Sequence, residues 1–489
     1  MTRTNLTAAQ TDRACGVLLG AAAGDALGAG YEFGSAPVVG RPRMIGGGLG
    51  GFAPGEWTDD TAQTYAIARV AAAGADLRTD EALDAIASGF AEWYAASPPD
   101  VGIQTGQVLR TVGPQGTAAE MTATAAALHA RTGKTAGNGA LMRTAPVALA
   151  YLDDPEALVD AASRIAALTH TDLLAPEASA LWCLGIRRTV LEGEIVDLRE
   201  ELSYLRPDRA ELWRDIIDQA EQEQPGRFRP NGFVVSALQA AWSAIVHTAQ
   251  VEHRPSEGRF SSAHLVAALE TAIEIGDDTD TVASIAGAML GGRWGASAVP
   301  AAWRRILHGW PGTSGEELAN LALLIVRRGR TDSAGWPGVD AIDYSGWGGV
   351  ESAVPHPYDE QVLLSGAVPL DDLPDEVTAV VSLCRLGRAQ VPERIEHRAA
   401  FRLIDTDARD NPNLEYVIDD AARTVLDLRD EGHTVLLHCV AGQSRTPTVA
   451  ARYAALLGYG TERALEDVCA VLPGAMPRPA LVAALRSLG

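Results

Sequence analysis

The sequence predicts two domains of different class, an all-α domain over residues 8–332 and a small α/β domain over residues 355–489. In the alanine-rich first part, apolar residues recur at helical spacing, and β-branched alternation is scarce. A stretch dense in Gly, Pro, Ser and Trp then predicts a linker over residues 333–354. Beyond it strand patterns alternate with helix patterns, which predicts a parallel sheet.

The individual elements follow from local patterns. In the first domain the clearest helical periods are TAQTYAIARVAAAGA, TVASIAGAMLGG and EELANLALLIVRR, at residues 61–75, 281–292 and 316–328. In the second domain the predicted order is strand 376–384, strand 400–404, helix 416–432, strand 434–439, helix 446–458 and helix 478–488.

Composition excludes several partners. The formal net charge is -23 and Lys134 is the only lysine, so we expect no binding to duplex nucleic acid. We expect no apolar run to approach the ~20 residues of a membrane helix, and we expect no membrane partner. The cysteines are scattered and odd in number, which favours a reducing, cytoplasmic location without disulfides: Cys15, Cys183, Cys384, Cys439 and Cys469.

Three acidic motifs stand out in the first domain: GDALGAGYEF at residues 24–33, GEWTDDT at 55–61 and GDDTDT at 276–281. The second and third precede helical runs, so their Asp and Thr side chains could simply cap helices. If the motifs met in a core, however, their carboxylates would repel one another unless cations lay between them. Carboxylate and hydroxyl oxygens without nearby His or Cys favour Mg²⁺ or Mn²⁺ over zinc.

Five motifs occur in a fixed order along the first domain: GDALG, WTDDT, GNGALMR, THTD and GDDTDT. Over about residues 10–330 they resemble the ADP-ribosylglycohydrolase family, of the dinitrogenase-reductase-activating type. The resemblance implies an all-α fold that removes ADP-ribose from a modified protein or an ADP-ribose derivative, with two Mg²⁺ or Mn²⁺ ions. It implies metal ligands at Thr58, Asp59, Asp60, Asp278, Asp280 and Thr281.

The same resemblance places Glu32 at the mouth of the metal site. It places the substrate near Gly137, Asn138, Gly139 and His170. Without it, His170 would be interpreted as a structural histidine. Either Glu32 or a ligand aspartate could take a proton from the attacking water. Asp277 is a departure, because many members of the family carry a glycine there.

A second motif, HCVAGQSRT, lies between a strand pattern and a helix pattern at residues 438–446. Cys439 is the only cysteine followed six positions later by an arginine, Arg445. Backbone N–H groups of this loop, which contains Gly442 and Ser444, would surround a phosphate at the helix N-terminus, and the helix dipole would lower the pKa of the thiol. Arg445 would add bidentate contacts to the phosphate.

This motif and its setting resemble the dual-specificity branch of the protein tyrosine phosphatase family over about residues 355–489. The resemblance implies a phosphorylated protein as partner and no cofactor. It implies Cys439 as nucleophile, Arg445 as phosphate clamp and Thr446 as a hydroxyl that eases departure of the thiolate. The general acid is expected upstream, at Asp407 by spacing or at Asp405 by its place after the strand.

The sequence therefore predicts a bifunctional hydrolase, with metal-dependent removal of ADP-ribose in one domain and cysteine-dependent phosphomonoester hydrolysis in the other. The alternative is a regulatory protein that binds ADP-ribose and phosphoprotein with one or both sites inactive.

Overall fold

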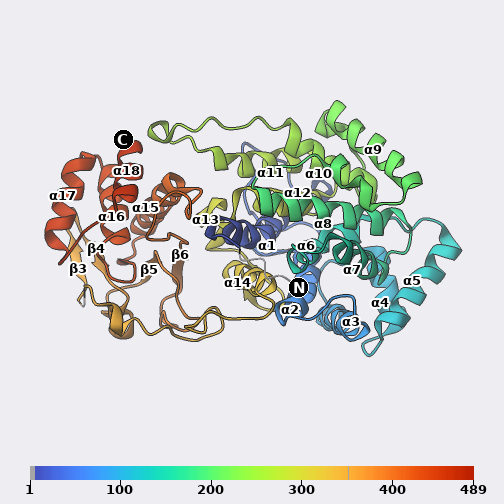
Figure 1. Ribbon diagram of the computed structural model, residues 1–489, viewed down its shortest axis with the longest axis horizontal. Helices are drawn as coiled ribbons and strands as arrows, with labels where there is room; N and C mark the ends of the chain where they lie inside the picture. The colour runs from blue at the N-terminus through green and yellow to red at the C-terminus, as the bar shows by residue number, and fades with distance from the viewer. Residues whose placement is uncertain (1–5, 351) are drawn as a thin grey trace.

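The structure, a computed structural model, describes residues 6–350 and 352–489 (Figure 1). A helical first domain lies beside a smaller domain that contains a sheet, as the sequence predicts. One short hairpin, β1 (His308–Gly309) and β2 (Thr313–Ser314), departs from the all-α prediction. The helices of the first domain are α1 (Ala8–Gly28), α2 (Asp59–Ala72), α3 (Asp80–Ala95), α4 (Ile103–Val112), α5 (Ala118–Thr132), α6 (Ala145–Ala150), α7 (Pro155–Ala167), α8 (Leu174–Glu192), α9 (Pro207–Gln222), α10 (Val234–His247), α11 (His264–Ile275), α12 (Thr279–Trp294), α13 (Ala301–Arg304) and α14 (Gly315–Val326).

The centre of the first domain is the packed pair α1 and α12. Glycines recur along both helices where their backbones touch, and a Cβ added at Gly20 would overlap the carbonyl oxygen of Gly287. At the end of α1, a Cβ on Gly28 would lie 2.5 Å from the Cα of Asp280. These glycines therefore permit the close approach that brings the start of α12 to the segment after α1.

The apolar segment Ala8–Gly34, which comprises α1 and the 3₁₀ helix η1 (Ala29–Gly34), is long and apolar enough to cross a membrane by length and composition. The expectation that no apolar run approaches that length is therefore wrong. Its apolar window is completely buried inside the first domain, against α12 and α14, so its composition is accounted for by the core.

The second domain has a five-stranded sheet of order β3-β4-β7-β5-β6. Four strands are parallel, but β3 pairs antiparallel with β4, so the prediction of a parallel sheet holds only in part. The strands and helices are β3 (Val354–His356), β4 (Asp359–Ser365), β5 (Ala379–Ser382), β6 (His397–Ala400), α15 (Leu414–Asp430), β7 (Val435–His438), α16 (Arg445–Leu456), α17 (Thr461–Val471) and α18 (Pro479–Ser487).

Three features of this domain differ from the sequence prediction. Strands β3 and β4 and helix α17 were not predicted, and β6 ends where the predicted strand 400–404 begins. Residues 401–404 belong to no strand, although the N–H group of Phe401 donates to the carbonyl oxygen of Ser382 in β5 at 2.8 Å, and Phe401 and Leu403 are buried in the core of the second domain. The apolar alternation at residues 401–404 therefore reflects burial of Phe401 and Leu403 in the core, although these residues lie outside the strand.

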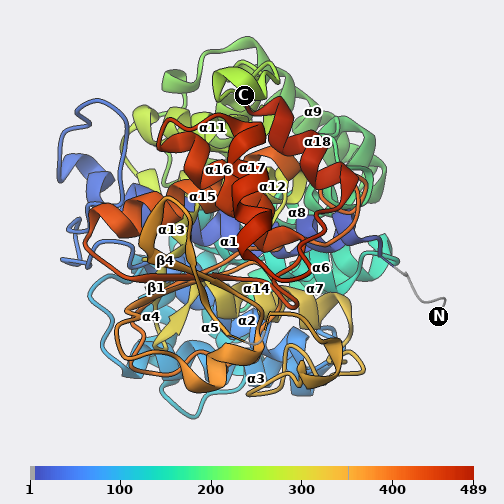
Figure 2. The same ribbon diagram turned by 90° about the vertical axis from the view of Figure 1, so that its left-hand side faces the viewer.

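The two domains share packed surfaces. Helices α15 to α18 cover one face of the sheet (Figure 2), whereas side chains from the other face, such as Val380 and Leu436, join the core that continues into the first domain. Trp336 and Tyr344, within the predicted linker, are buried in that same core. Across the interface, Asn413 Nδ2 donates to the carbonyl oxygen of Trp294 at 2.6 Å.

Candidate active sites

The acidic motifs of the first domain converge at the starts of two helices. Carboxylate oxygens of Glu32, Asp278 and Asp280 all lie within 4.8 Å of one another. Asp60 Oδ2 accepts hydrogen bonds from the hydroxyls of Thr58 at 3.3 Å and Thr281 at 3.2 Å, which joins the start of α2 to the start of α12. The fold therefore assembles one acidic site from residues more than 200 positions apart.

Helix capping does not account for these side chains. Thr58 and Asp278 occupy the N-cap positions of α2 and α12, yet neither side chain makes a capping hydrogen bond. Asp25 on α1 satisfies the start of α2 instead, because its carboxylate accepts from the N–H groups of Thr58 and Thr61, each at 2.9 Å. Sequence reasoning missed this role of Asp25, although the residue lies within the GDALG motif.

The carboxylates of the acidic site are buried close together, which disfavours their charged forms. Burial, together with neighbouring carboxylates, raises the pKa of Asp59, Asp60 and Asp280 well above the ordinary aspartate value. Burial, followed by the charges of Asp100 and Asp278, raises the pKa of Glu32 to about 8. Asp100 was not identified from the sequence.

Three buried carboxylate oxygens in this site have no hydrogen-bond partner among the described residues: Glu32 Oε2, Asp60 Oδ1 and Asp280 Oδ1. Buried polar atoms are rarely left without a partner. Because every candidate ligand offers a hard oxygen, the residues fit divalent cations such as Mg²⁺ or Mn²⁺.

The predicted substrate residues lie on one side of the acidic site. Asn138, in the 3₁₀ helix η2 (Asn138–Arg143), donates through Nδ2 to Asp278 Oδ2 at 2.7 Å. His170 packs against the adjoining loop, since a Cβ at Gly137 would lie 3.3 Å from its Nε2, and one at Gly139 would lie 3.3 Å from its Cε1. Burial lowers the pKa of His170 to about 3, so its ring is neutral at physiological pH.

Arg143 joins two of the motifs to helix α2, and sequence reasoning assigned it no role. Its guanidinium is fully buried and donates to Gln63 Oε1 on α2 at 2.5 Å and to Thr169 Oγ1 at 2.6 Å. The same group lies 4.5 Å from the centre of the Phe90 ring. Its place at the end of GNGALMR was the available signal.

The departure at Asp277 has a conformational explanation. Asp277 has φ of 63°, in the left-handed region that favours glycine and that Asp tolerates better than most residues. Its carboxylate points away from the acidic site, where it pairs with Arg229 Nη2 at 2.8 Å. The extra charge is therefore neutralised by an arginine.

The second site is a single loop between β7 and α16. Cys439 follows β7 and is buried, and Arg445 begins α16. Arg445 Nη1 donates to the carbonyl oxygens of Leu383 at 2.8 Å and Leu403 at 3.0 Å, whereas its buried Nε has no partner among the described residues. The guanidinium is thus anchored at one end.

The loop requires glycine at position 442. Gly442 has φ of 71°, and a Cβ there would lie 2.9 Å from the backbone of Ser365. Thr446 also faces this backbone, because its hydroxyl donates to the carbonyl oxygen of Ser365 at 3.3 Å. Behind the loop, His438 Nε2 lies 2.8 Å from Ser382 Oγ, and burial lowers the pKa of His438 to about 4.

The two candidate acids occupy different environments. Asp405 lines the same cavity as Cys439, and its carboxylate accepts a hydrogen bond from Ser444 Oγ at 2.6 Å. Asp407 lies outside the lining of that cavity and accepts from the N–H group of Arg409 at 2.9 Å. That hydrogen bond lowers the pKa of Asp407, which disfavours the protonated form that an acid needs.

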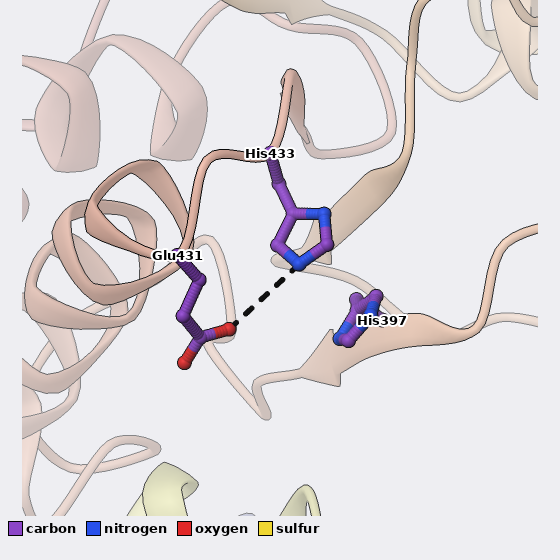
Figure 3. Close-up of side chains that lie close together, drawn as sticks. All are labelled: His397, Glu431 and His433. Atoms are coloured by element: carbon purple, nitrogen blue, oxygen red, sulfur yellow. Dashed lines mark ion pairs between the residues drawn. The ribbon is translucent and has the colours of Figure 1, made fainter.

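A third group of ionisable side chains lies at the opposite end of the same sheet. His397, Glu431 and His433 face one another within 4.8 Å (Figure 3). Glu431 already pairs with Arg305 Nη2 of the first domain at 2.9 Å, and His433 Nδ1 lies 3.1 Å from Thr378 Oγ1. Because His397 begins β6 whereas Cys439 follows the end of β7, this cluster is separate from the thiol loop.

Comparisons with known proteins cover mainly the first domain. Residues 6–334 match the model of the ADP-ribosylglycohydrolase family. The ADP-ribosyl-dinitrogen reductase glycohydrolase of Rhodospirillum rubrum is 29% identical over 301 residues, which are 60% of this chain and 89% of that protein. The ADP-ribosylarginine hydrolase Tri1 of Pseudomonas putida (strain GB-1) is 30% identical over 312 residues, with 60% and 73% covered. The structure of Tk-PTP in the active form is 24% identical and covers 28% of this chain and 95% of its own, but its TM-score of 0.25 supports no argument about the second domain.

Proposed function

Because the chain belongs to the ADP-ribosylglycohydrolase family, we propose that its first domain hydrolyses the bond between ADP-ribose and a modified protein or small molecule. The observation that carries this proposal is the cluster of Glu32, Asp278 and Asp280, whose carboxylate oxygens lie within 4.8 Å of one another. Two Mg²⁺ or Mn²⁺ ions held there, by Thr58, Asp59, Asp60, Asp278, Asp280 and Thr281, would supply charge stabilisation and activation of water.

Glu32 is the base we propose for this reaction. Its buried Oε2 lacks a hydrogen-bond donor among the described residues, and bound cations would lower its raised pKa, so that the carboxylate could accept a proton from water. The loop at Gly137 and Gly139, held by His170, would shape the binding site for the substrate. Neutral His170 would do so without placing a positive charge beside the acidic site.

Release of ADP-ribose tests the first activity. The name of the Pseudomonas putida relative, an ADP-ribosylarginine hydrolase, favours a linkage to arginine as the first substrate, with serine-linked ADP-ribose as the comparison. We expect release with Mg²⁺ or Mn²⁺, loss of release with chelator, and recovery when the metal is restored. No release from any linkage with any divalent metal would leave only the alternative, a domain that binds ADP-ribose without cleaving it.

We also propose that the second domain hydrolyses a phosphomonoester. The carrying observation is Arg445, which is anchored by two carbonyl oxygens beside Cys439 while its Nε remains without a partner. The Cys439 thiolate would attack phosphorus as the bond to the leaving oxygen breaks, and an acid would protonate that oxygen. Water would then break the sulfur–phosphorus bond and release phosphate, restoring the thiolate.

Asp405 is the acid we propose, because it lines the cavity beside Cys439. The substitutions Asp405→Asn and Asp407→Asn should be compared on p-nitrophenyl phosphate and on an alkyl phosphate. An acid matters more for the poor leaving group, so we expect Asp405→Asn to lose more activity on the alkyl ester. If only Asp407→Asn behaved in this way, the role would belong to Asp407.

Hydrolysis of p-nitrophenyl phosphate tests the second activity. We expect activity that chelator leaves unchanged and that Cys439→Ser abolishes, with Cys469→Ser as the control because Cys469 lies outside the cavity. Equal turnover by Cys439→Ser would exclude the thiolate mechanism.

The cellular setting is also a proposal. All five cysteines are free, and a thiol nucleophile requires reduction, so we place the protein in the cytoplasm. The strongly acidic chain should not bind duplex nucleic acid, which a salt-dependent binding measurement would test.

A further inference from the structure

The thiol loop opens into a cavity of about 1100 Å³ between the two domains. On the second domain, the cavity is lined by residues that follow three neighbouring parallel strands, β5, β6 and β7. On the first domain, residues at the starts of α1 and α14, including Asp12 and Glu316, form the wall. The carboxyl ends of parallel strands are common ligand sites, but here residues of the first domain complete the site.

The charge in this cavity is the reverse of the charge of the chain. Eight arginines and four carboxylates line it, although the whole chain has 40 basic and 63 acidic side chains. A cavity whose lining has an excess of one sign of charge attracts ligands of the opposite sign. The lining therefore favours an anionic ligand.

Several of these arginines form no direct ion pair, although the carboxylates of Asp12 and Glu316 lie near enough to attract Arg402. Within residues 6–350 and 352–489, no carboxylate forms an ion pair with Arg327, Arg398 or Arg402. Arg402 Nη1 instead contacts Cys15 Sγ at 2.9 Å, and its guanidinium lies 5.6 Å from the centre of the Trp336 ring. Arg327 lies 5.7 Å from the same ring and donates to the Trp336 carbonyl oxygen at 3.5 Å.

The positive charges of Arg327 and Arg402 are thus gathered around one neutral indole. A guanidinium that forms no ion pair within the protein is well suited to bind a phosphate or carboxylate of a ligand. Arg445 already serves the phosphate at Cys439 in the proposed reaction. Arg327 and Arg402 therefore provide for another anionic group in the same cavity.

We infer that this cavity binds a small organic phosphate with at least two anionic groups, one at Cys439 and Arg445 and the other at Arg327 and Arg402. This inference rests on the proposed phosphatase function and narrows its substrate from a phosphorylated protein to a small molecule. The volume of about 1100 Å³ lies just above the range of about 300–1,000 Å³ that is typical of small-molecule sites. First-domain residues form the facing wall, which favours a small molecule over a folded protein partner.

The test uses the full chain with four probes: p-nitrophenyl phosphate, a hexose bisphosphate, a nucleoside 3′,5′-bisphosphate and a phosphotyrosine peptide. We expect at least one bisphosphate to have a KM at least 10-fold below that of p-nitrophenyl phosphate. Arg402→Gln and Arg327→Gln should each reduce that preference at least 10-fold. Arg388→Gln, whose side chain lies outside the cavity, should not.

A binding measurement separates this inference from the phosphatase proposal. In Cys439→Ser, calorimetric affinity for the preferred bisphosphate should fall at least 10-fold when Arg402→Gln is added, with unfolding temperatures compared to exclude misfolding. Binding without turnover in the unsubstituted chain would refute the phosphatase proposal and retain the site. Equal KM values for all four probes, preference for the peptide, or affinity unaffected by Arg402→Gln would overturn the inference.

Discussion

The two candidate sites are built in opposite ways. The acidic site collects Glu32 from the segment after α1 and Asp60 and Asp280 from the starts of α2 and α12. Each of the three leaves one buried oxygen without a partner among the described residues. The thiol site is one continuous loop, from Cys439 to Arg445, in which the arginine is largely held by backbone carbonyls.

The two sites also differ in what neutralises their charged groups. The carboxylates repel one another and raise the pKa of their neighbours, a condition that bound cations would relieve. The thiol loop carries its own cation, Arg445, and a helix N-terminus. The first site should therefore depend on metal and on the global fold, whereas the second should depend on a few adjacent residues.

The largest expected effect is a reciprocal loss of activity. Cys439→Ser should reduce phosphomonoester hydrolysis at least about 1000-fold and leave ADP-ribose release unchanged. Asp280→Asn should reduce ADP-ribose release at least about 1000-fold and leave phosphomonoester hydrolysis unchanged. Each substitution removes a group that only one site contains. Both reactions should be measured on both variants, and a variant that lost both activities would contradict the separation of the sites.

The dependence of the acidic site on helix packing can be tested at Gly20. Gly20→Ala would force a methyl group into the backbone of α12 and should destabilise the first domain by about 3 kcal/mol, with loss of ADP-ribose release. Urea unfolding monitored by tryptophan fluorescence measures the effect. Gly226→Ala is the matched control, because nothing lies within 4 Å of its added Cβ. Equal stability of the two variants would show that the close contact is dispensable.

The setting of the thiol loop predicts a pH effect through His438. Burial lowers its folded-state pKa from 6.5 to about 4, so between these values the unfolded chain binds a proton that the folded chain does not. Stability should therefore fall as pH decreases from 6.5 to 4, by roughly 3 kcal/mol at most from this residue. In His438→Gln the fall should be smaller, whereas exposed His308→Gln should retain it. Denaturation at pH 7 and pH 5 distinguishes these outcomes.

The smallest predicted effect concerns the acidic site without metal. In the presence of chelator, Asp280→Asn should raise the free energy of unfolding by about 1 kcal/mol, because the amide is neutral and avoids the ionisation that burial and the neighbouring carboxylates oppose. Added Mg²⁺ or Mn²⁺ should stabilise the unsubstituted chain more than the variant. The exposed substitution Asp215→Asn serves as control. A destabilised variant under chelator would indicate that Asp280 has a structural role that outweighs repulsion.

Local motifs predicted more of the thiol site than of the acidic site. The strand, loop and helix around Cys439 could be predicted because they are contiguous, and the structure has them in that order. The acidic motifs were identified, but helix capping remained an equal explanation until Asp25 was seen to cap α2. Arg143 and Asp100 were missed because their partners lie far away in the sequence.

By itself, the sequence determined the two domain classes, the ordered acidic motifs and the Cys439–Arg445 loop, because these depend on periodicity and residue type over short segments. Only the tertiary structure decided which carboxylates share one buried space, that Asp405 and not Asp407 lines the cavity of Cys439, and that arginines from both domains surround that cavity. Burial and charge proximity arise from contacts between distant segments, and no local pattern encodes them.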